Sequence, residues 1–483
     1  MKLCLICDLH LPYHKGALQY DLLRWAMDDL QTKKADAVVV LGDFTADGDL
    51  DVAREFAARI KTLPIPVILL TGNADFRTPA ARDDIRAMAS PTLTKLGGLN
   101  LVALHDGEGR VPEEDFTALE QAGGDTLVFM HHAPKSLSAA QAGRLLDWCE
   151  AHPDAQLFHG HLHRSESVGN IHSLQAADPD KAIGENACIT YYDTDAKTLE
   201  KAYYSCPMPE DFPNWVGISC YHPMDDLPYA IENRVGCIEL RSNSLKCDRD
   251  GLISLVREWR AAGGWNLSLH MPDLAYSEGK PSCDWAAYID LARKLGVDRL
   301  TVHVPKVSVR EVQTGNGVLE AIAEMAAEHL AKLPESCVIG IENMHMSPGE
   351  PFDDSRRFGY LPEEALTFMR CMRAKCRQKV GFNLDVGHAR NNPPFSQRYP
   401  IGTWYAEVGG ETVGYHVHQV RMNQGKKENH CPITEFYGKL ISYASFFGQW
   451  SRGGLNKAPV ILEIRPDESG SRYAQSVALF QSK

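Results

Sequence analysis

Short runs of strand-forming residues recur along the chain, and helical stretches separate most of them. Before residue 170 these runs are KLCLICD, AVVVLGD, PVILLTGN, LVALHDG, LVFMHH and LFHGHLH, and most of them end in Asp, Asn or His. A buried parallel strand carries its last side chain to the carboxyl edge of its sheet, where α/β proteins bind their ligands. The pattern predicts an α/β fold in which these polar side chains converge on one site.

A second series of such runs begins at Trp215. It comprises WVGISCY, CIELRS, NLSLHMP, RLTVHVP, CVIGIEN, VGFNLDVGH, GYHVHQV and PVILEIR. Eight strand-and-helix units over residues 215–465 match the length of about 250 residues that a closed (β/α)8 barrel needs. We therefore expect a TIM barrel in the second half of the chain, with its polar residues at the carboxyl ends of the strands.

The domain boundary is predicted from a proline-rich segment. Residues 188–205 read as two closing strands, and Pro207, Pro209 and Pro213 follow them within a few residues. The 483 residues are too many for a single small module. We predict a first domain at residues 1–206, a linker at 207–214 and a second domain at 215–483.

Charge and cysteine content narrow the possible partners and compartment. Residues 1–210 carry 19 Lys and Arg against 31 Asp and Glu, which accounts for most of the net charge of −13. Such a field repels a polyanion, so extended DNA is not an expected partner. The thirteen cysteines are scattered and odd in number, as in reduced proteins. No signal peptide or long apolar run is evident, so we expect a cytoplasmic protein without a membrane partner.

Metal-type ligands gather at the predicted strand ends of the first half. They are Asp8, His10, Asp43, Asn73, His131, His161 and His163. Carboxylate and amide oxygens mixed with imidazoles suit a pair of borderline divalent metals bridged by one carboxylate. We expect Asp43 to be the carboxylate that bridges the two metals.

These motifs resemble the calcineurin-like metallophosphoesterases across residues 1–205. The resemblance implies an αββα sandwich and a phosphodiesterase or phosphatase activity. It also implies two divalent metals (Mn, Fe or Zn), one on Asp8, His10, Asp43 and His163 and one on Asp43, Asn73, His131 and His161. We take His131 and His161 as catalytic candidates. The family's usual GNH[DE] is GNAD here, so Ala74 replaces a histidine, and Asp75 or His132 is the candidate substitute.

The carboxyl face of the predicted barrel is also rich in metal-type ligands. Its strands supply His270, His303, Glu342, Asp385, His388, His418 and Glu463, and the segment after the seventh strand adds Glu428 and His430. An ordinary mononuclear site needs four or five ligands, whereas eight or nine can hold three metals. We therefore expect a trinuclear centre, with Glu342 and Glu463 as catalytic candidates.

The barrel pattern resembles the xylose isomerase-like barrels and, within them, endonuclease IV, over residues 215–465. The sugar isomerases and epimerases need mainly Glu342, Asp385, His418 and Glu463. The additional histidines, with Glu428 in place of the usual Asp, match the trinuclear endonuclease IV type, which implies three metals (Zn, Mn or Fe). His416 lies on the same strand face as His418, so the sequence leaves open which of the two is the ligand. Asp273 stands where that family has a DNA-wedging aromatic residue, which argues against duplex DNA.

The sequence thus predicts a bifunctional, metal-dependent phosphoester hydrolase that acts on a small phosphorylated metabolite or a short nucleic-acid end. One alternative makes the barrel a sugar-phosphate isomerase or epimerase, in which Glu342 and Glu463 exchange a proton. Another makes the first domain a non-catalytic binding platform because of Ala74. The sequence leaves the substrate, the metal identities and the oligomeric state open.

Overall fold

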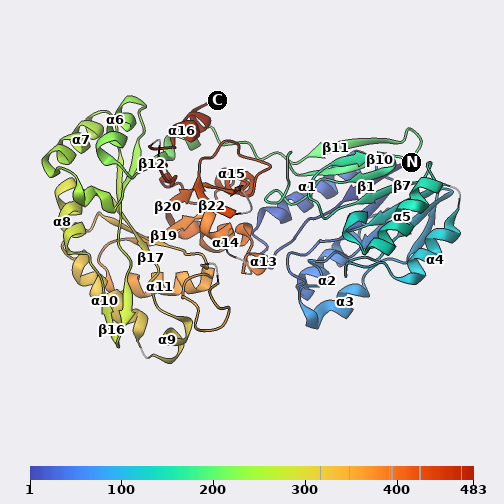
Figure 1. The fold of residues 1–483 in the computed structure, drawn as a ribbon, viewed down its shortest axis with the longest axis horizontal. Helices are drawn as coiled ribbons and strands as arrows, with labels where there is room; N and C mark the ends of the chain where they lie inside the picture. The colour runs from blue at the N-terminus through green and yellow to red at the C-terminus, as the bar shows by residue number, and fades with distance from the viewer. Residues whose placement is uncertain are drawn as a thin grey trace. The chain divides into compact units, whose positions relative to one another are not determined.

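A computed structural model describes residues 1–123, 125–315, 317–347, 349–390, 392, 395–423, 426–468 and 470–482. The chain forms two compact units (Figure 1). The first unit comprises Met1–Pro207 and Phe436–Gly448, and the second comprises Met208–Glu435 and Gln449–Lys483. Among the described residues, no helix combines the length and the apolar character needed to cross a membrane.

The first unit contains two β-sheets. The five-stranded sheet has the order β11–β10–β1–β2–β3, with β1 at Lys2–Ile6, β2 at Ala37–Leu41, β3 at Val67–Leu70, β10 at Cys188–Asp193 and β11 at Thr198–Tyr203. The six-stranded sheet has the order β4–β5–β6–β7–β9–β8, with β4 at Leu93–Leu96, β5 at Leu99–Ala103, β6 at Thr126–Met130, β7 at Gln156–His159, β8 at Glu166–Val168 and β9 at Ile171–Ser173. Strands β1, β2 and β3 are parallel, as are β5, β6 and β7.

Apolar cores hold these sheets and their helices in four layers. One core joins the facing sides of the two sheets through residues such as Leu5, Val39 and Phe129. Helices α1 (Leu18–Thr32) and α2 (Leu50–Ile60) cover the outer face of the first sheet, and α4 (Glu113–Ala122) and α5 (Ala139–Ala151) cover the second. Strands buried on both faces need continuous apolar runs, which explains sequences such as AVVVL. The predicted αββα sandwich is confirmed.

The second unit is a closed barrel of eight parallel strands, as predicted. Its order is β12–β13–β14–β17–β18–β19–β20–β23. The strands are β12 at Val216–Cys220, β13 at Cys237–Leu240, β14 at Asn266–His270, β17 at Arg299–His303, β18 at Val338–Glu342, β19 at Val380–Asp385, β20 at Thr412–Val417 and β23 at Val460–Leu462. Each predicted run of residues 215–465 contains one of these strands.

Helices surround the barrel strands, and two hairpins decorate the barrel (Figure 1). The main helices are α6 (Pro223–Glu232), α7 (Arg249–Ala261), α8 (Ala286–Leu295), α10 (Val318–Leu330), α11 (Pro362–Lys375), α14 (Ile401–Val408) and α16 (Ala474–Gln481), and the shorter ones are α9 (Val309–Thr314), α12 (Val386–Arg390) and α13 (Phe395–Arg398). Helix α15 (Ala444–Ser451) is divided between the two units, and the short helix α3 (Arg82–Arg86) belongs to the first unit. The hairpins pair β15 (Ala275–Ser277) with β16 (Lys280–Ser282) and β21 (Gln419–Asn423) with β22 (Lys426–Cys431).

The segment Phe436–Gly448 belongs to the first unit although it lies between β22 and β23 in the sequence. The hydroxyl of Tyr437 donates to the carbonyl of Cys206, and Ser442 Oγ donates to the carbonyl of Pro179, both at 2.7 Å. The domain prediction, which ended the first domain at residue 206, did not include this segment. Its apolar residues read as an ordinary barrel helix, so the sequence gives no local sign of it.

Candidate metal centres

The predicted ligands of the first unit converge at the carboxyl ends of its central strands. Asp8, Asp43 and Asn73 follow β1, β2 and β3, whereas His131 follows β6 and the GHLH segment follows β7. The ligand atoms of one group lie within 4.8 Å of one another, namely those of Asp8, His10, Asp43 and His163. A second such group contains His131, His132 and His161.

Asp43 lies between these two groups. Its Oδ2 is 3.8 Å from Nε2 of His10, and its Oδ1 is 3.4 Å from Nε2 of His131. His131 also has its Nε2 3.0 Å from Oδ1 of Asn73, while its Nδ1 contacts the carbonyl of Leu41 at 2.9 Å. One ring nitrogen is thus held by the backbone, and the other faces the carboxylate and amide oxygens. Asp43 therefore occupies the position that a bridging carboxylate requires.

The backbone around these residues is unusually tight. A Cβ on Gly72 would lie 2.3 Å from Oδ1 of Asp43, and a Cβ on Gly160 would lie 2.8 Å from Oδ2 of Asp8. Asp8, His10, Asp43, His161 and His163 all have positive φ angles, between 48° and 67°. Residues other than glycine adopt this conformation rarely, and usually where surrounding contacts impose it.

Burial and neighbouring charges set the protonation of the histidines. Burial, reinforced by the nearby His131 and His132, lowers the pKa of His161 to about 4. Burial would also lower the pKa of His131, but the carboxylates of Asp43, Asp8 and Asp106 raise it to about 9. A metal at this position would therefore displace a proton from His131, because a ligating imidazole must be neutral at the bonding nitrogen.

Asp75, a catalytic candidate, has a structural position instead. Its Oδ1 accepts hydrogen bonds from the amide and the hydroxyl of Thr45, and its Oδ2 accepts one from the amide of Gly72. The side chain is fully buried. Asp75 therefore ties the loops after β2 and β3 together, and both of its carboxylate oxygens already accept hydrogen bonds from them. The amide of Ala74 donates to Oδ1 of Asp43 at 2.6 Å.

Asp106 is a residue of this site that the sequence analysis did not assign. Its carboxylate accepts from the amides of His131 and His132, and its Oδ2 lies 3.2 Å from Nδ1 of His132. The His132 ring lies 4.5 Å from the His161 ring. Asp106 follows strand β5 near the end of the run LVALHDG, which is the same strand-end signal that identified the other ligands.

The barrel brings its predicted ligands into two groups that share Glu342. One group contains His270, His303 and Glu342, and the other contains Glu342, Asp385, His416 and Glu463. Nε2 of His270 and Nε2 of His303 lie 3.6 and 3.8 Å from the Glu342 carboxylate. Oε1 of Glu342 and Oδ2 of Asp385 are buried and accept no hydrogen bond from the described residues. Such orphaned acceptors fit a cation.

His416, rather than the predicted His418, lies in the group of four. Its Nδ1 is 2.9 Å from Oε2 of Glu463 and 3.2 Å from Oε2 of Glu342. Strand β20 ends at Val417, so His416 still points into the barrel from the strand, whereas His418 lies beyond its end. His418 has its Nε2 3.5 Å from Oδ1 of Asp385 and its ring 4.2 Å from that of His430.

The remaining predicted barrel ligands are only partly brought together. Nδ1 of His388 lies 3.5 Å from Oδ2 of Asp385, and the His388 ring is 5.8 Å from that of His430. Glu428 is exposed, and its Oε1 accepts a hydrogen bond from Asn423 at 2.7 Å. The ligand groups found among the described residues do not include Glu428.

Two charged residues on β13 and at its end complete the barrel site, and the sequence analysis missed both. Oε1 of the buried Glu239 lies 2.9 Å from Nε2 of His416, so Glu239 fixes the ring whose other nitrogen faces Glu463. Nη2 of Arg241 lies 2.5 Å from Oε1 of Glu463. Inward-facing charges in the apolar run CIELRS were the signal that could have found them.

Comparison with known proteins finds one family in each part of the chain. The model of the calcineurin-like phosphoesterase family matches residues 1–165, and the model of the xylose isomerase-like TIM barrel family matches residues 272–483. The chain thus joins a segment that matches calcineurin-like phosphoesterases to one that matches xylose isomerase-like TIM barrels. Both families are generally dependent on divalent metals. No curated protein matches the sequence.

Solved structures resemble each half at low sequence identity. Endonuclease IV from Thermus thermophilus is 17% identical, with a TM-score of 0.38, and the match covers 55% of this chain and 97% of that one. A xylose isomerase domain protein from Planctomyces limnophilus is 14% identical, with a TM-score of 0.33 and coverage of 51% and 88%. A dimetal phosphatase from Danio rerio is 16% identical, with a TM-score of 0.29 and coverage of 40% and 92%.

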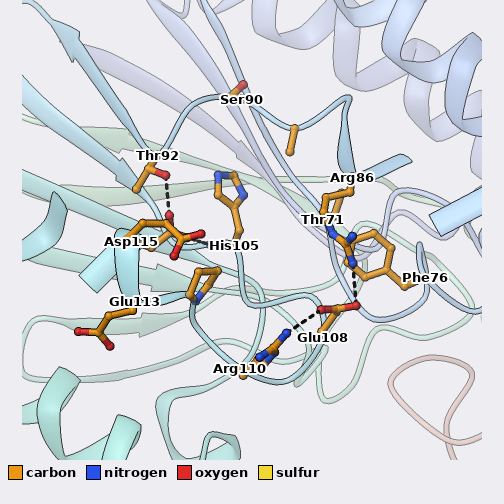
Figure 2. Close-up of a pocket in the computed structure, with 13 residues that line it drawn as sticks. Thr71, Phe76, Arg86, Ser90, Thr92, His105, Glu108, Arg110, Glu113 and Asp115 are labelled. Carbon is orange, nitrogen blue, oxygen red and sulfur yellow. Dashed lines mark hydrogen bonds and ion pairs between the residues drawn. The ribbon is translucent and has the colours of Figure 1, made fainter. Parts of the chain in front are cut away.

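The first unit also has a pocket of about 700 Å³, and Figure 2 shows the side chains that line it. The buried Thr71 and Phe76 and the ring of His105 are among them. Arg86 and Arg110 both approach Glu108 there, with Arg86 Nη2 2.7 Å from Oε1 of Glu108. Its charged groups are therefore already paired to a large extent.

Proposed function

We propose that the chain is a bifunctional metal-dependent phosphoester hydrolase, with one centre in each unit. The first centre would act as a phosphodiesterase or phosphatase and the second as a phosphoesterase of the barrel. The substrate we propose is a small phosphorylated metabolite or a short nucleic-acid end. The acidic first half disfavours extended DNA through its negative field.

The position of Asp43 is the observation that carries the proposal for the first unit. Its two oxygens face two different groups of histidines, and the surrounding backbone is held in rare conformations that keep it there. Asp8, His10, Asp43 and His163 would hold one ion, and Asp43, Asn73, His131 and His161 the other. A pair of divalent ions supplies charge stabilisation for phosphoryl transfer and lowers the pKa of water.

The chain's own residues orient this site. Asp106 holds the backbone of His131 and the ring of His132 beside it. The apolar Ala74 contributes only its backbone amide, which donates a hydrogen bond to Asp43. Because position 74 lacks an imidazole, we expect substrates with good leaving groups to be hydrolysed more easily than those whose leaving oxygen needs a proton.

In the barrel, the shared position of Glu342 supports a centre of more than one metal. His270 and His303 approach it from one side, and His416 from another. An isomerase or epimerase remains the second candidate, because Glu342, Asp385, His416 and Glu463 form a complete four-ligand group by themselves. The two candidates differ in whether activity requires His270 and His303.

The metal content of the whole chain and its products test the proposal. Elemental analysis should find two ions in the first unit and more than one in the barrel, and a screen of phosphorylated compounds should detect released phosphate. A single barrel ion, with proton exchange into the substrate and no phosphate release, would establish the isomerase. We further place the protein in the cytoplasm, since its thirteen cysteines are free and nine of them are buried.

A further inference from the structure

A charged cluster lies directly beside the His270, His303 and Glu342 group of the barrel. Asp273, which follows β14, is its centre. One carboxylate oxygen lies 2.5 Å from Nδ1 of His303, and the other lies 2.7 Å from Nζ of Lys306. Nη2 of Arg357 is 3.9 Å from Oδ1. A single carboxylate thus joins an imidazole and two cationic side chains from three different segments.

The contact with His303 fixes the direction of the imidazole ring. Because Nδ1 faces Asp273, the remaining nitrogen, Nε2, is the one that faces Glu342 at 3.8 Å. A carboxylate that holds the outer nitrogen of a metal-binding histidine sets its orientation and increases its basicity. Asp273 is therefore a positioning residue for His303.

Asp273 does not use all the hydrogen-bond donors of the two cationic side chains. The Arg357 side chain is mostly buried, and its Nη2 donates to the carbonyl of Val304 at 2.7 Å. Its Nε is buried and has no hydrogen-bond partner among the described residues. The Lys306 side chain is 59% exposed, so its ammonium can turn toward a ligand while it stays near Asp273.

The other nearby carboxylate does not complete these contacts. Glu350 uses Oε1 to accept from the backbone amide of Arg357, and it uses Oε2 to accept from the hydroxyl of Tyr360 and the amide of Ser347. A buried donor without a partner costs about 1–3 kcal/mol. The Arg357 guanidinium therefore has binding capacity that the described protein does not use.

We propose that Lys306 and Arg357 form an anion subsite that binds the non-reacting phosphate or carboxylate group of the barrel's substrate. Asp273 holds both cations and His303, so that the anion lies beside the metal-type ligands. This inference rests on the proposed function, because it assumes that the barrel site receives a substrate. An arginine and a lysine offer a planar fork and a mobile point charge, a combination that suits anionic oxygens.

Anion binding to the full chain tests the subsite. The background is Asp43→Asn, which disables the first centre, and the protein is loaded with Zn²⁺. Isothermal titration calorimetry with inorganic phosphate and with acetate shows which anion binds more tightly. Lys306→Ala and Arg357→Lys should each weaken the preferred anion about tenfold or more, while the zinc content stays unchanged. Lys294→Ala is the matched control, because Lys294 also pairs with an aspartate, Asp290, at 3.0 Å.

The positioning role of Asp273 has a separate readout. Asp273→Asn should lower the zinc content of the barrel, measured by elemental analysis, because His303 loses its orienting carboxylate. The subsite is overturned if the Asp43→Asn background binds neither anion, or if Lys306→Ala and Arg357→Lys in that background bind as tightly as Lys294→Ala. A wild-type barrel without zinc contradicts the proposed function instead, and the anion titrations of the same variants then still decide the subsite.

Discussion

At the scale of single residues, backbone strain marks the candidate ligands. Among the described residues, ten that are not glycine have positive φ angles, and six of these are predicted ligands, namely Asp8, His10, Asp43, His161, His163 and His430. The left-handed conformation costs an L-residue roughly 1 kcal/mol or more. Strain of this kind persists where function requires a particular side-chain direction, so stability alone does not explain why these residue types occupy these positions.

Replacing one strained ligand in two ways separates strain from binding. His163 has a φ of 55° and a side chain that is 20% exposed. In metal-free protein, His163→Gly should be more stable to urea than His163→Ala by about 1 kcal/mol, because glycine accepts this conformation without strain. Both variants should lose metal from the first centre. Equal stability of the two variants would mean that this backbone relaxes easily.

The ligand types and their places at strand ends could be predicted from sequence, but the choice between neighbouring ligands could not. His416 and His418 share one strand face, so only the position where β20 ends separates them. Glu428 and His430 have the same spacing, yet His430 is buried while Glu428 is exposed and lies outside the ligand groups of the described residues. Glu239 was missed because an acid inside an apolar strand reveals its partner only after the barrel closes.

The assignment of His416 is open to a direct test. His416→Ala should remove about one metal ion per chain, since it deletes a ligand that faces both Glu342 and Glu463. His418→Ala, on the neighbouring position, serves as the control and should keep the ion of this group. Elemental analysis after gel filtration measures both. Loss of the ion in His418→Ala alone would restore the original prediction.

At the scale of elements, close backbone contact between loops shapes the first centre. The loops after β2 and β3 approach so closely that a Cβ on Gly42 would lie 2.6 Å from the amide nitrogen of Gly72. Asp75 adds hydrogen bonds to both loops. The sequence shows the two glycines in LGD and TGN, but only the parallel pairing of β2 with β3 explains why both must be small.

This contact predicts different outcomes for two glycine substitutions in the first unit. Gly72→Ala should lower the free energy of unfolding by about 1–3 kcal/mol, because its Cβ would meet Asp43 and the His131 ring. Gly143→Ala in helix α5 has open space around its Cβ and should be neutral or stabilising by up to about 1 kcal/mol. Urea unfolding measures both. A neutral Gly72→Ala would show that the loop shifts without cost.

At the scale of the whole molecule, each compact unit contains a complete candidate site. The strand runs were sufficient to predict an α/β domain followed by a barrel, because continuous apolar runs and their polar ends are local features. The sandwich architecture of the first domain came from the resemblance to the calcineurin-like metallophosphoesterases. The assignment of Phe436–Gly448 to the first unit was not predictable. Its partners, such as Cys206 and Pro179, are more than 200 residues away in the sequence.

Because the two sites are built from separate residues, we expect their metals to be lost independently. Asp43→Asn removes the carboxylate between the first unit's two groups and should abolish turnover of bis-p-nitrophenyl phosphate with manganese, while the barrel keeps its metal. Glu342→Gln should empty the barrel groups and leave that turnover within about twofold of wild type, since substitutions at sites that share no partner residues usually behave additively. Elemental analysis and the turnover assay, applied to both variants, measure this. If either variant lost both the turnover and the barrel metal, the two centres would depend on each other.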